Sequence, residues 1–438
     1  MSLLDKLSDE KYWLRFYEYK TSLICGGAFE NELADFIEKK EYLPVCEAVK
    51  NGEPFPLPKK SVISKTHSHK KRTIYMYPYR ENMVLKLLTY LMTRKYDHLF
   101  CNGLFSFRPN RSAKDAIRML NSAEGMGNKY TYKVDVSNYF NSVDISMFLP
   151  VLKEALCDDE ELYTFLSVLL QEEYVYDNGV MIKEEKGIMA GTPVSAFYAN
   201  LYLRDLDEYF VSRNIPYARY SDDIIVFADS PDEAENYAEI IRSALKDKGL
   251  KVNPDKEVFS SPETGWTFLG FEVKGKDIDI APVTVEKLKK KMRRKSRALL
   301  RWRQRSDVSG EKAAAAFIRT FNRKLFENSA NNELTWSYWF FSVINSTKRL
   351  NEIDLYAQDC IRYIISGTRT KARFNVRYSD LKNLGYKSLV HEYYAVVSPS
   401  GGLSRESPPD TPENEHVKLL QGMIDFNKTI NKVSLKPF

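Results

Sequence analysis

Hydrophobic and polar residues follow two different spacings along this 438-residue chain, and the spacing changes from segment to segment. Apolar side chains that recur every third or fourth residue predict a helix, whereas alternating or β-branched and aromatic runs predict a strand. Helices are predicted within residues 1–50, 81–92, 145–171, 195–210, 231–246 and 282–305, with more helices to about residue 397. Strands are predicted at 73–78, 129–136 and 266–273, and hairpins at 174–182 and 217–227.

Turn and breaker residues divide these elements. Asn178-Gly179 is a pair that tolerates positive φ, so it predicts the turn of the first hairpin. The proline-rich segment 52–58 separates the N-terminal helices from the rest of the chain, and residues 398–415 are so poor in apolar side chains that we expect disorder. The length and the 43% hydrophobic content predict two or three domains, and we find no internal repeat.

Charge and cysteine content narrow the picture. The net charge is only +6, but residues 282–305 hold eleven Lys or Arg and one acid, Glu286. Such a cluster attracts a polyanion, although a solvated charged face has the same composition. The five cysteines form no C-x-x-C pair, which argues against a zinc ribbon or disulfide framework and fits a reducing cytosol. The start is charged from the fifth residue and no apolar run suits a membrane span, so we expect a cytoplasmic protein.

Two adjacent carboxylates, Asp222 and Asp223, stand between the two strands predicted at 217–227. Like charges at such a turn repel each other unless cations lie between them, and Mg²⁺ takes oxygen ligands that it shares with substrate phosphates. Two such ions can activate a hydroxyl and stabilise a leaving pyrophosphate. A third carboxylate is then needed, and Asp135 at the end of a predicted strand is the candidate. A solvated turn and a helix N-cap are the ordinary alternatives for these residues.

Seven segments, in order, resemble those of group II intron-like bacterial reverse transcriptases. They are K-R-T-I-Y-M-Y-P-Y-R (71–80), F-S-F-R-P-N-R-S-A-K-D-A-I (105–117), V-D-V-S-N-Y-F-N-S-V-D (134–144), A-G-T-P-V-S-A-F-Y-A-N-L-Y-L (190–203), Y-S-D-D (220–223), G-L-K-V-N-P-D-K (249–256) and F-L-G-F (268–271). The resemblance runs from about residue 60 to 275, about half of the chain.

The resemblance implies an α+β right-hand polymerase with a helical C-terminal extension. The expected domains are an N-terminal helical extension (1–58), fingers (59–128), a palm (129–281, with a fingers insertion around 145–190), a helical thumb and extension (282–397), and a flexible tail with a short helix (398–438).

The resemblance also assigns roles to individual residues. It implies two Mg²⁺ ions, with Mn²⁺ as an alternative, on Asp135, Asp222 and Asp223. The expected nucleotide-binding residues are Lys71, Arg72, Phe140 and Lys256, with Phe140 blocking a ribose 2′-hydroxyl; a solvated basic turn and a core phenylalanine are the alternatives. The expected nucleic-acid-binding residues are Arg108, Arg111, Lys289, Lys290, Arg293, Arg294 and Arg297, although Arg108 and Arg111 could instead hold internal carboxylates.

One departure concerns the family's P-Q-G segment, where Ala190 or Val194, depending on the alignment, stands in place of the glutamine. We find no Cys/His endonuclease cluster and no retron signature, so the chain is most similar to the stand-alone "unknown group" of reverse transcriptases, many of them in anti-phage defence. The leading hypothesis is cDNA synthesis from deoxynucleotides on a non-coding RNA template. The alternatives are template-independent or protein-primed DNA synthesis, and an RNA-binding splicing cofactor with a residual polymerase site. The oligomeric state cannot be read from the sequence.

Overall fold

The computed structural model describes residues 2–23, 28–64, 71–123, 125–326 and 336–397. The predicted disordered segment 398–415, the rest of the tail to residue 438 and most of the basic stretch 65–72 lie outside these ranges. The described chain divides into two compact units: one holds residues 2–120 and 129–260, and the other holds 121–128 and 261–397. Apart from residues 121–128, the second unit starts with a small sheet that precedes the basic helix.

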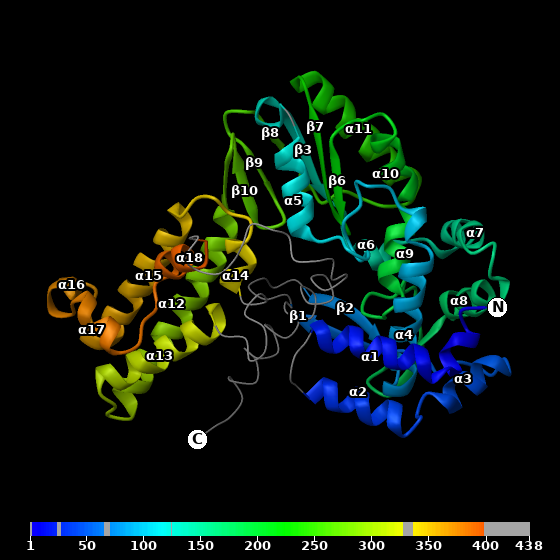
Figure 1. Ribbon diagram of the computed structural model, residues 1–438, viewed down its shortest axis with the longest axis horizontal. Helices are drawn as coiled ribbons and strands as arrows, with labels where there is room; N and C mark the ends of the chain where they lie inside the picture. The colour runs from blue at the N-terminus through cyan, green and yellow to red at the C-terminus, as the bar shows by residue number, and fades with distance from the viewer. Residues whose placement is uncertain (1, 24–27, 65–70, 124, 327–335, 398–438) are drawn as a thin grey trace. The chain divides into compact units, whose positions relative to one another are not determined.

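Helices and one sheet make up the first part of the first unit (Figure 1). The helices are η1 (Asp5–Ser8), α1 (Glu10–Leu23), α2 (Ala28–Glu38), α3 (Leu43–Lys50), α4 (Tyr79–Lys95), η2 (Asp97–Leu99), α7 (Ile145–Ala155) and α8 (Glu160–Gln171). The sheet has the strand order β2-β1-β4-β5, from β1 (Lys59–Ser64), β2 (Lys71–Met76), β4 (Tyr174–Asp177) and β5 (Val180–Lys183). Asn178 and Gly179 both have positive φ in the β4–β5 turn, as predicted.

A second sheet of the same unit has the order β6-β7-β3-β8 and carries the acidic turn. Its strands are β3 (Tyr130–Asp135), β6 (Tyr217–Tyr220), β7 (Asp223–Ala228) and β8 (Val258–Ser260). The remaining helices of the unit are α5 (Ala113–Ser122), α6 (Tyr139–Ser142), α9 (Ser195–Tyr202), α10 (Arg204–Val211), α11 (Pro231–Asp247) and η4 (Pro254–Lys256). Helix α11 packs on β3 and β7, while α10 packs on β6. The single helix predicted at 195–210 is thus wrong, because the chain breaks at Leu203 into α9 and α10.

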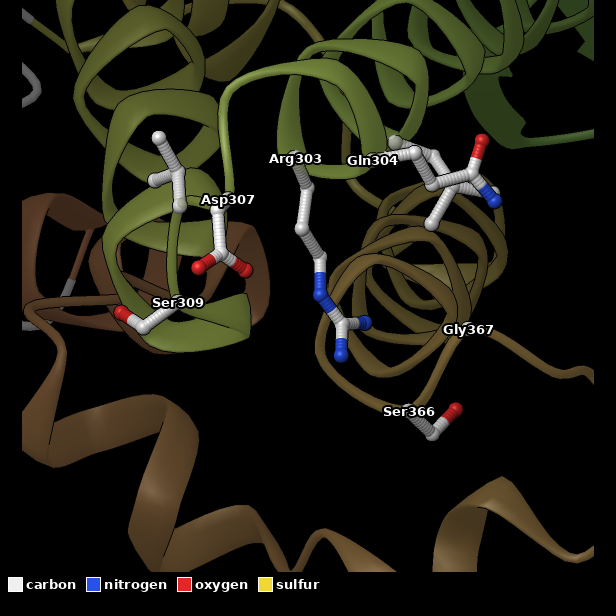
Figure 2. A pocket seen from close by; sticks show the side chains of 8 residues that line it. Arg303, Gln304, Asp307, Ser309, Ser366 and Gly367 are labelled. Atoms are coloured by element: carbon white, nitrogen blue, oxygen red, sulfur yellow. The ribbon is translucent and has the colours of Figure 1, made fainter.

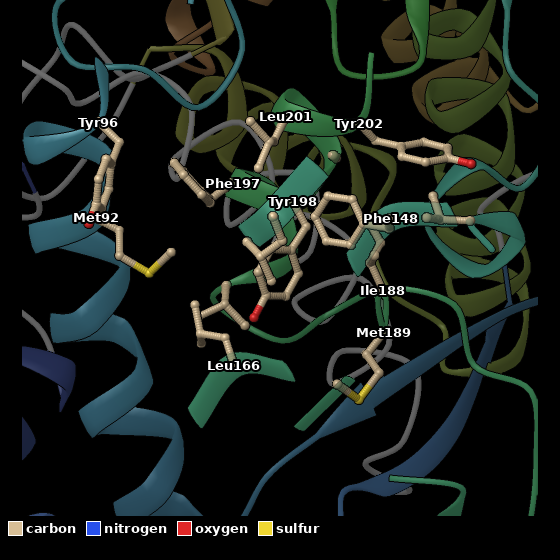
Figure 3. Close-up of a cluster of buried hydrophobic side chains, with 14 of the residues drawn as sticks. Met92, Tyr96, Phe148, Leu166, Ile188, Met189, Phe197, Tyr198, Leu201 and Tyr202 are labelled. Carbon is tan, nitrogen blue, oxygen red and sulfur yellow. The ribbon is translucent and has the colours of Figure 1, made fainter. Parts of the chain in front are cut away.

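The core of the first unit lies between α4, α7, α8 and α9. Figure 3 shows Tyr198 of α9 surrounded by Phe148, Leu166 and Met189 from other segments. All four side chains are fully buried. Burying an aromatic or aliphatic side chain of this size stabilises the fold by about 1.5 to 3 kcal/mol, so this cluster fixes α9 against α4 and α7.

The second unit combines a small sheet with a helical bundle. It contains η3 (Met126–Asn128) and the sheet β11-β10-β9, from β9 (Trp266–Phe268), β10 (Phe271–Lys274) and β11 (Asp277–Ile280). The single strand predicted at 266–273 is wrong, because Leu269 and Gly270 adopt positive φ and form a turn. The helices are α12 (Pro282–Arg305), α13 (Gly310–Leu325), α14 (Trp336–Phe341), α15 (Lys348–Ser366), α16 (Ala372–Asn375), α17 (Tyr378–Asn383) and α18 (Leu389–Val397).

The long helices α12, α13 and α15 pack side by side in this bundle (Figure 1). Val285, Met292 and Leu299 form the buried stripe of α12, as the spacing of its apolar residues predicts. Helices combined with mainly antiparallel sheets in both units agree with the α+β class and the elements of a right-hand polymerase.

Candidate active site

Three carboxylates meet where β3 ends and β7 begins. Asp135 is the last residue of β3 and lies opposite Asp223, the first residue of β7. The Val136 N–H donates to the Asp222 carbonyl at 2.9 Å, so the ladder continues into the turn. Ser221 has φ of 59°, which turns the chain sharply enough to place two successive acids at the strand end. The structure therefore brings together Asp135, Asp222 and Asp223, although they are far apart in the sequence.

The electrostatics of this turn are unfavourable for bare carboxylates. Burial raises the pKa of Asp222, and the nearby charge of Asp135 raises it further. Burial and the charges of Asp222 and Asp135 raise the pKa of Asp223 to about 7. Lys256 lowers both pKa values in part, and Arg72 lowers that of Asp222. Negative charge thus exceeds positive charge here, and a divalent cation would relieve the excess.

Asp135 is held by neighbours from the segment before β8. Its carboxylate accepts hydrogen bonds from Lys256 Nζ at 2.5 Å and Asn253 Nδ2 at 3.3 Å. Among the described residues, no group of three or more Asp, Glu, His or Cys side chains is already arranged closely enough to coordinate one metal ion. The oxygen-only donor set and its excess charge suit Mg²⁺ or Mn²⁺. Binding would require Asp135 to exchange the Lys256 ammonium for the ion.

A buried polar network, which the sequence analysis missed, binds the backbone of the acidic turn at Ser221. Arg219 is completely buried, and its guanidinium makes two bonds to the Asp207 carboxylate. It also donates to the Ser221 carbonyl at 3.3 Å and the Asn200 carbonyl at 2.9 Å. The Ser221 N–H donates to Ser106 Oγ at 2.9 Å, so both peptide groups of Ser221 are fixed. The signal available in the sequence was an arginine inside a predicted strand, three residues before the first of the two acids.

Known proteins share this arrangement of segments. A family model described as "Reverse transcriptase (RNA-dependent DNA polymerase)" matches residues 57–273, which include all three acids and the network behind them. The chain contains a reverse transcriptase domain.

Curated relatives match the reverse transcriptase domain at low identity. The group II intron-encoded protein LtrA of Lactococcus lactis subsp. cremoris is 22% identical over 225 residues, 50% of this chain and 36% of that protein. The putative COX1/OXI3 intron 2 protein of Saccharomyces cerevisiae is 24% identical over 253 residues, 44% of this chain and 29% of that protein. The chain thus spans about a third of the length of these relatives. Among solved structures, telomerase from Candida albicans in complex with a telomeric RNA fragment is similar with a TM-score of 0.41 and 13% identity, over 83% of this chain and 71% of that one.

The predicted nucleotide-binding residues of the reverse transcriptase domain lie on segments linked to the acidic turn. Lys71 and Arg72 begin β2, and Arg72 is close enough to Asp222 to lower its pKa. Asn141, just after Phe140, joins β2 to the loop before α9: its Nδ2 donates to the Thr73 carbonyl at 3.2 Å and its Oδ1 accepts from the Ala190 N–H at 3.1 Å. Close packing therefore fixes the loop in which Ala190 or Val194 replaces the family's glutamine.

Phe140 itself is partly buried on α6 and packs against the core of the first unit. Its ring meets that of Phe107 edge-on, with centroids 6.5 Å apart. Gly187 lies directly beneath, because a Cβ there would stand 2.5 Å from the Phe140 carbonyl oxygen. The contacts with Phe107 and Gly187 fix the position of Phe140. A side chain that excludes a 2′-hydroxyl by its bulk must be fixed in this way. The role of Phe140 toward the sugar stays a prediction.

Arg108 has the second of the two roles that the sequence left open, because it holds an internal carboxylate, and its assignment as a nucleic-acid-binding residue was wrong. Its guanidinium binds the Asp97 carboxylate through two nitrogens, at 2.7 and 3.1 Å, and the Cys101 carbonyl through the third. The side chain is almost completely buried, so it braces the loop before α5. Arg111 donates to Asn102 Oδ1 at 2.7 Å and remains half-buried on the same loop.

In the second unit, the basic helix α12 presents only part of its charge to solvent. Lys290, Arg293, Arg294 and Arg297 are exposed. Lys289 is not, since it forms ion pairs with Glu286 and with Glu352 of α15, so its assignment as a nucleic-acid-binding residue was wrong.

A groove beside α12 carries cations that the sequence did not single out. Lys295, Arg319 and Arg323 line a hollow of about 500 Å³ between α12 and α13. Burial and the charge of Arg323 lower the pKa of Lys295, and burial and the charges of Lys295, Arg323 and Arg294 lower the pKa of Lys324. The positive charges of these side chains repel one another, so binding of an anion between them would be favourable.

No helix in the described ranges combines the length and the apolar composition needed to span a bilayer.

Proposed function

We propose that this chain is a divalent-metal-dependent RNA-directed DNA polymerase. The observation that carries the proposal is the meeting of Asp135 with Asp222 and Asp223 in a site with excess negative charge, inside a reverse transcriptase domain. When bound there, two Mg²⁺ or Mn²⁺ ions would activate the primer 3′-hydroxyl and stabilise the pyrophosphate that leaves.

The residues of the chain have complementary tasks in this proposal. The three aspartates hold the metals, and the Arg219 network keeps the turn in the conformation that presents them. Lys71 and Arg72 neutralise the triphosphate of the incoming nucleotide, as preorganised cations do at transferring phosphoryl groups. Phe140 selects deoxynucleotides over ribonucleotides by blocking a ribose 2′-hydroxyl. The exposed cations of α12 hold backbone phosphates of the template and primer.

The biological setting belongs to the same proposal. We propose that the template is a non-coding RNA and that the cDNA serves defence against phage. This placement is supported by the resemblance of the sequence to stand-alone defence-associated enzymes. Phage challenge of cells that carry the wild-type gene or the Asp222→Ala variant tests it: equal survival would contradict a defence role for the polymerase site.

The polymerase activity is tested by primer extension with purified protein, an RNA template, a DNA primer, deoxynucleotides and Mg²⁺. The expected result is a product that copies the template and disappears in Asp222→Ala. Asp247→Asn, which changes an exposed acid on α11, is the matched control and should extend normally. Product whose sequence ignores the template, or that forms after the RNA is digested, would favour template-independent synthesis. A failure to extend every template offered, including RNA that co-purifies, would contradict the proposal.

A further inference from the structure

The segment between α15 and α17 displays an aromatic ring in a basic setting. Residues 367–377 read G-T-R-T-K-A-R-F-N-V-R, with four cations and no acid. Phe374 in this segment has 84% of its surface exposed, more than any other large hydrophobic side chain in the described ranges. Ordinary core formation does not explain a phenylalanine that is directed so fully into solvent.

The segment is anchored on both sides of this ring. Ala372 and Val376 are buried, with 7% and 4% exposure, and Arg362 Nε donates to the Val376 carbonyl at 3.2 Å. Lys371 adopts a left-handed conformation, with φ of 55°, where the chain enters α16. Anchors at positions 372 and 376 leave Phe374 outside while the backbone is fixed. The exposure of the ring is therefore a product of the fold.

The cations around the ring are mostly uncompensated. Arg369, Lys371, Arg373 and Arg377 are all exposed. Within the described part of the chain only Arg373 of these four forms an ion pair, with Asp359 at 3.1 Å. A fixed aromatic face among uncompensated cations is the combination that binds single-stranded nucleic acid, because the ring stacks on a base while cations contact the backbone.

A hollow of about 510 Å³ borders the start of the segment. Figure 2 shows Arg303 between Asp307 and Ser309 on one side and Ser366 and Gly367 on the other. Arg303 is held in place by the Ile364 and Ile365 carbonyls, at 3.0 and 2.8 Å. The side chains that line this hollow therefore include both hydrogen-bond donors and acceptors, and they lie next to Ser366 and Gly367, where the basic segment begins.

We propose that residues 369–377 form a second RNA-binding site, in which an unpaired base stacks on Phe374 and Lys371 and Arg377 contact the flanking phosphates. This inference rests on the proposed function for its choice of RNA as the ligand. One ring among cations is too little apolar surface to insert into a lipid bilayer, so a nucleic acid fits the chemistry better than a membrane. The site lies in the second unit and contains none of the residues assigned to nucleotidyl transfer.

The test compares Phe374→Ala with Tyr394→Ala in the full-length protein. Tyr394 is a matched control because it is an aromatic residue on α18 of the same unit with 55% exposure. The probe is a fluorescent RNA hairpin with a single-stranded tail. We expect Phe374→Ala to weaken binding about 5- to 150-fold, the effect of one lost stacked base, and Tyr394→Ala to leave it unchanged. Phe374→Trp should restore binding, and the unfolding temperatures should be equal because the ring is exposed.

Charge and location are tested separately. Lys371→Ala and Arg377→Ala should each reduce the slope of log affinity against log salt by about 0.7, the value for one phosphate contact on a single strand. RNA containing 4-thiouridine should crosslink to the peptide that contains Phe374. Binding of Phe374→Ala within twofold of wild type, or an equal loss in Tyr394→Ala, would overturn the inference. So would binding of the segment to anionic vesicles in place of RNA.

Primer extension on a short primer–template separates this inference from the proposed function. Phe374→Ala should extend such a substrate at the wild-type rate. Normal extension together with unchanged RNA binding would refute the second site and leave the polymerase proposal standing. Absence of extension by the wild-type protein would refute the polymerase proposal instead.

Discussion

Replacing Asp223 by asparagine should stabilise the metal-free protein. The pKa of Asp223 is raised to about 7 by burial and by the charges of Asp222 and Asp135. An ordinary aspartate has a pKa of about 3.9, and a tenfold change in an acid dissociation constant is worth about 1.4 kcal/mol, so the charged form is disfavoured by about 4 kcal/mol in the folded protein. Solvent reaches part of the side chain, and Lys133 and Lys256 offset some repulsion. We therefore expect Asp223→Asn to raise the free energy of unfolding by about 1 to 3 kcal/mol at pH 8.

The sign of this effect fixes its pH dependence. The folded-state pKa lies above the unfolded one, so between about pH 4 and pH 7 the folded protein binds more protons than the unfolded protein. Wild-type stability falls as the pH rises through this window. The advantage of Asp223→Asn should be complete above pH 7 and should vanish below about pH 4.

Thermal unfolding in EDTA at a series of pH values measures this difference. The expected gain in unfolding temperature at pH 8 is a few degrees for a unit of this size. Asp247→Asn, which removes an exposed charge, should change it very little. Added Mn²⁺ should raise the unfolding temperature of the wild type more than that of Asp223→Asn, because only an ion that binds the folded state stabilises it. A variant that is less stable than wild type at pH 8 without metal would refute the reasoning.

Three further substitutions test other parts of the site. Arg219→Met leaves the Asp207 carboxylate buried without its partner, so urea unfolding should show a loss of about 3 to 5 kcal/mol; an unchanged midpoint would contradict the network. Phe140→Ala should lower discrimination against ribonucleotides by about tenfold or more in competition assays, and unaltered discrimination would remove the gate. Lys256→Met frees Asp135 from a competing ammonium, so calorimetry should show tighter Mn²⁺ binding, whereas weaker binding would mean that Lys256 helps the metal.

Runs of β-branched and aromatic residues were sufficient to locate the central strands and the acidic turn, because β3 and β7 are buried along most of their length and not on one face alone. The breaks at Leu203 and Leu269 were not foreseen. Leu203 carries no Gly or Pro signal, and at Leu269 only the following Gly270 hinted at a turn. The spacing of apolar residues predicts the structure that a segment favours by itself. The breaks at Leu203 and Leu269 depend instead on how α9 and α10, and β9 and β10, pack against the rest of the protein.

Charged residues were harder to assign than apolar ones. Arg108 binds Asp97, and Lys289 binds a glutamate 63 residues further along the chain. An Arg or Lys looks the same in the sequence whether it binds a phosphate or a carboxylate. The partner is known only from the tertiary fold, which brings it near. Phe374 escaped notice for a related reason, because exposure is a property of the anchored loop and not of the residue.

The most direct test of the central claim is anomalous diffraction from crystals grown with Mn²⁺, a primer–template and a non-hydrolysable deoxynucleotide. Two anomalous peaks bound by oxygens of Asp135, Asp222 and Asp223 are expected, with Lys256 displaced from Asp135. Peaks elsewhere in the protein, with the Lys256–Asp135 ion pair intact beside a bound nucleotide, would contradict the account.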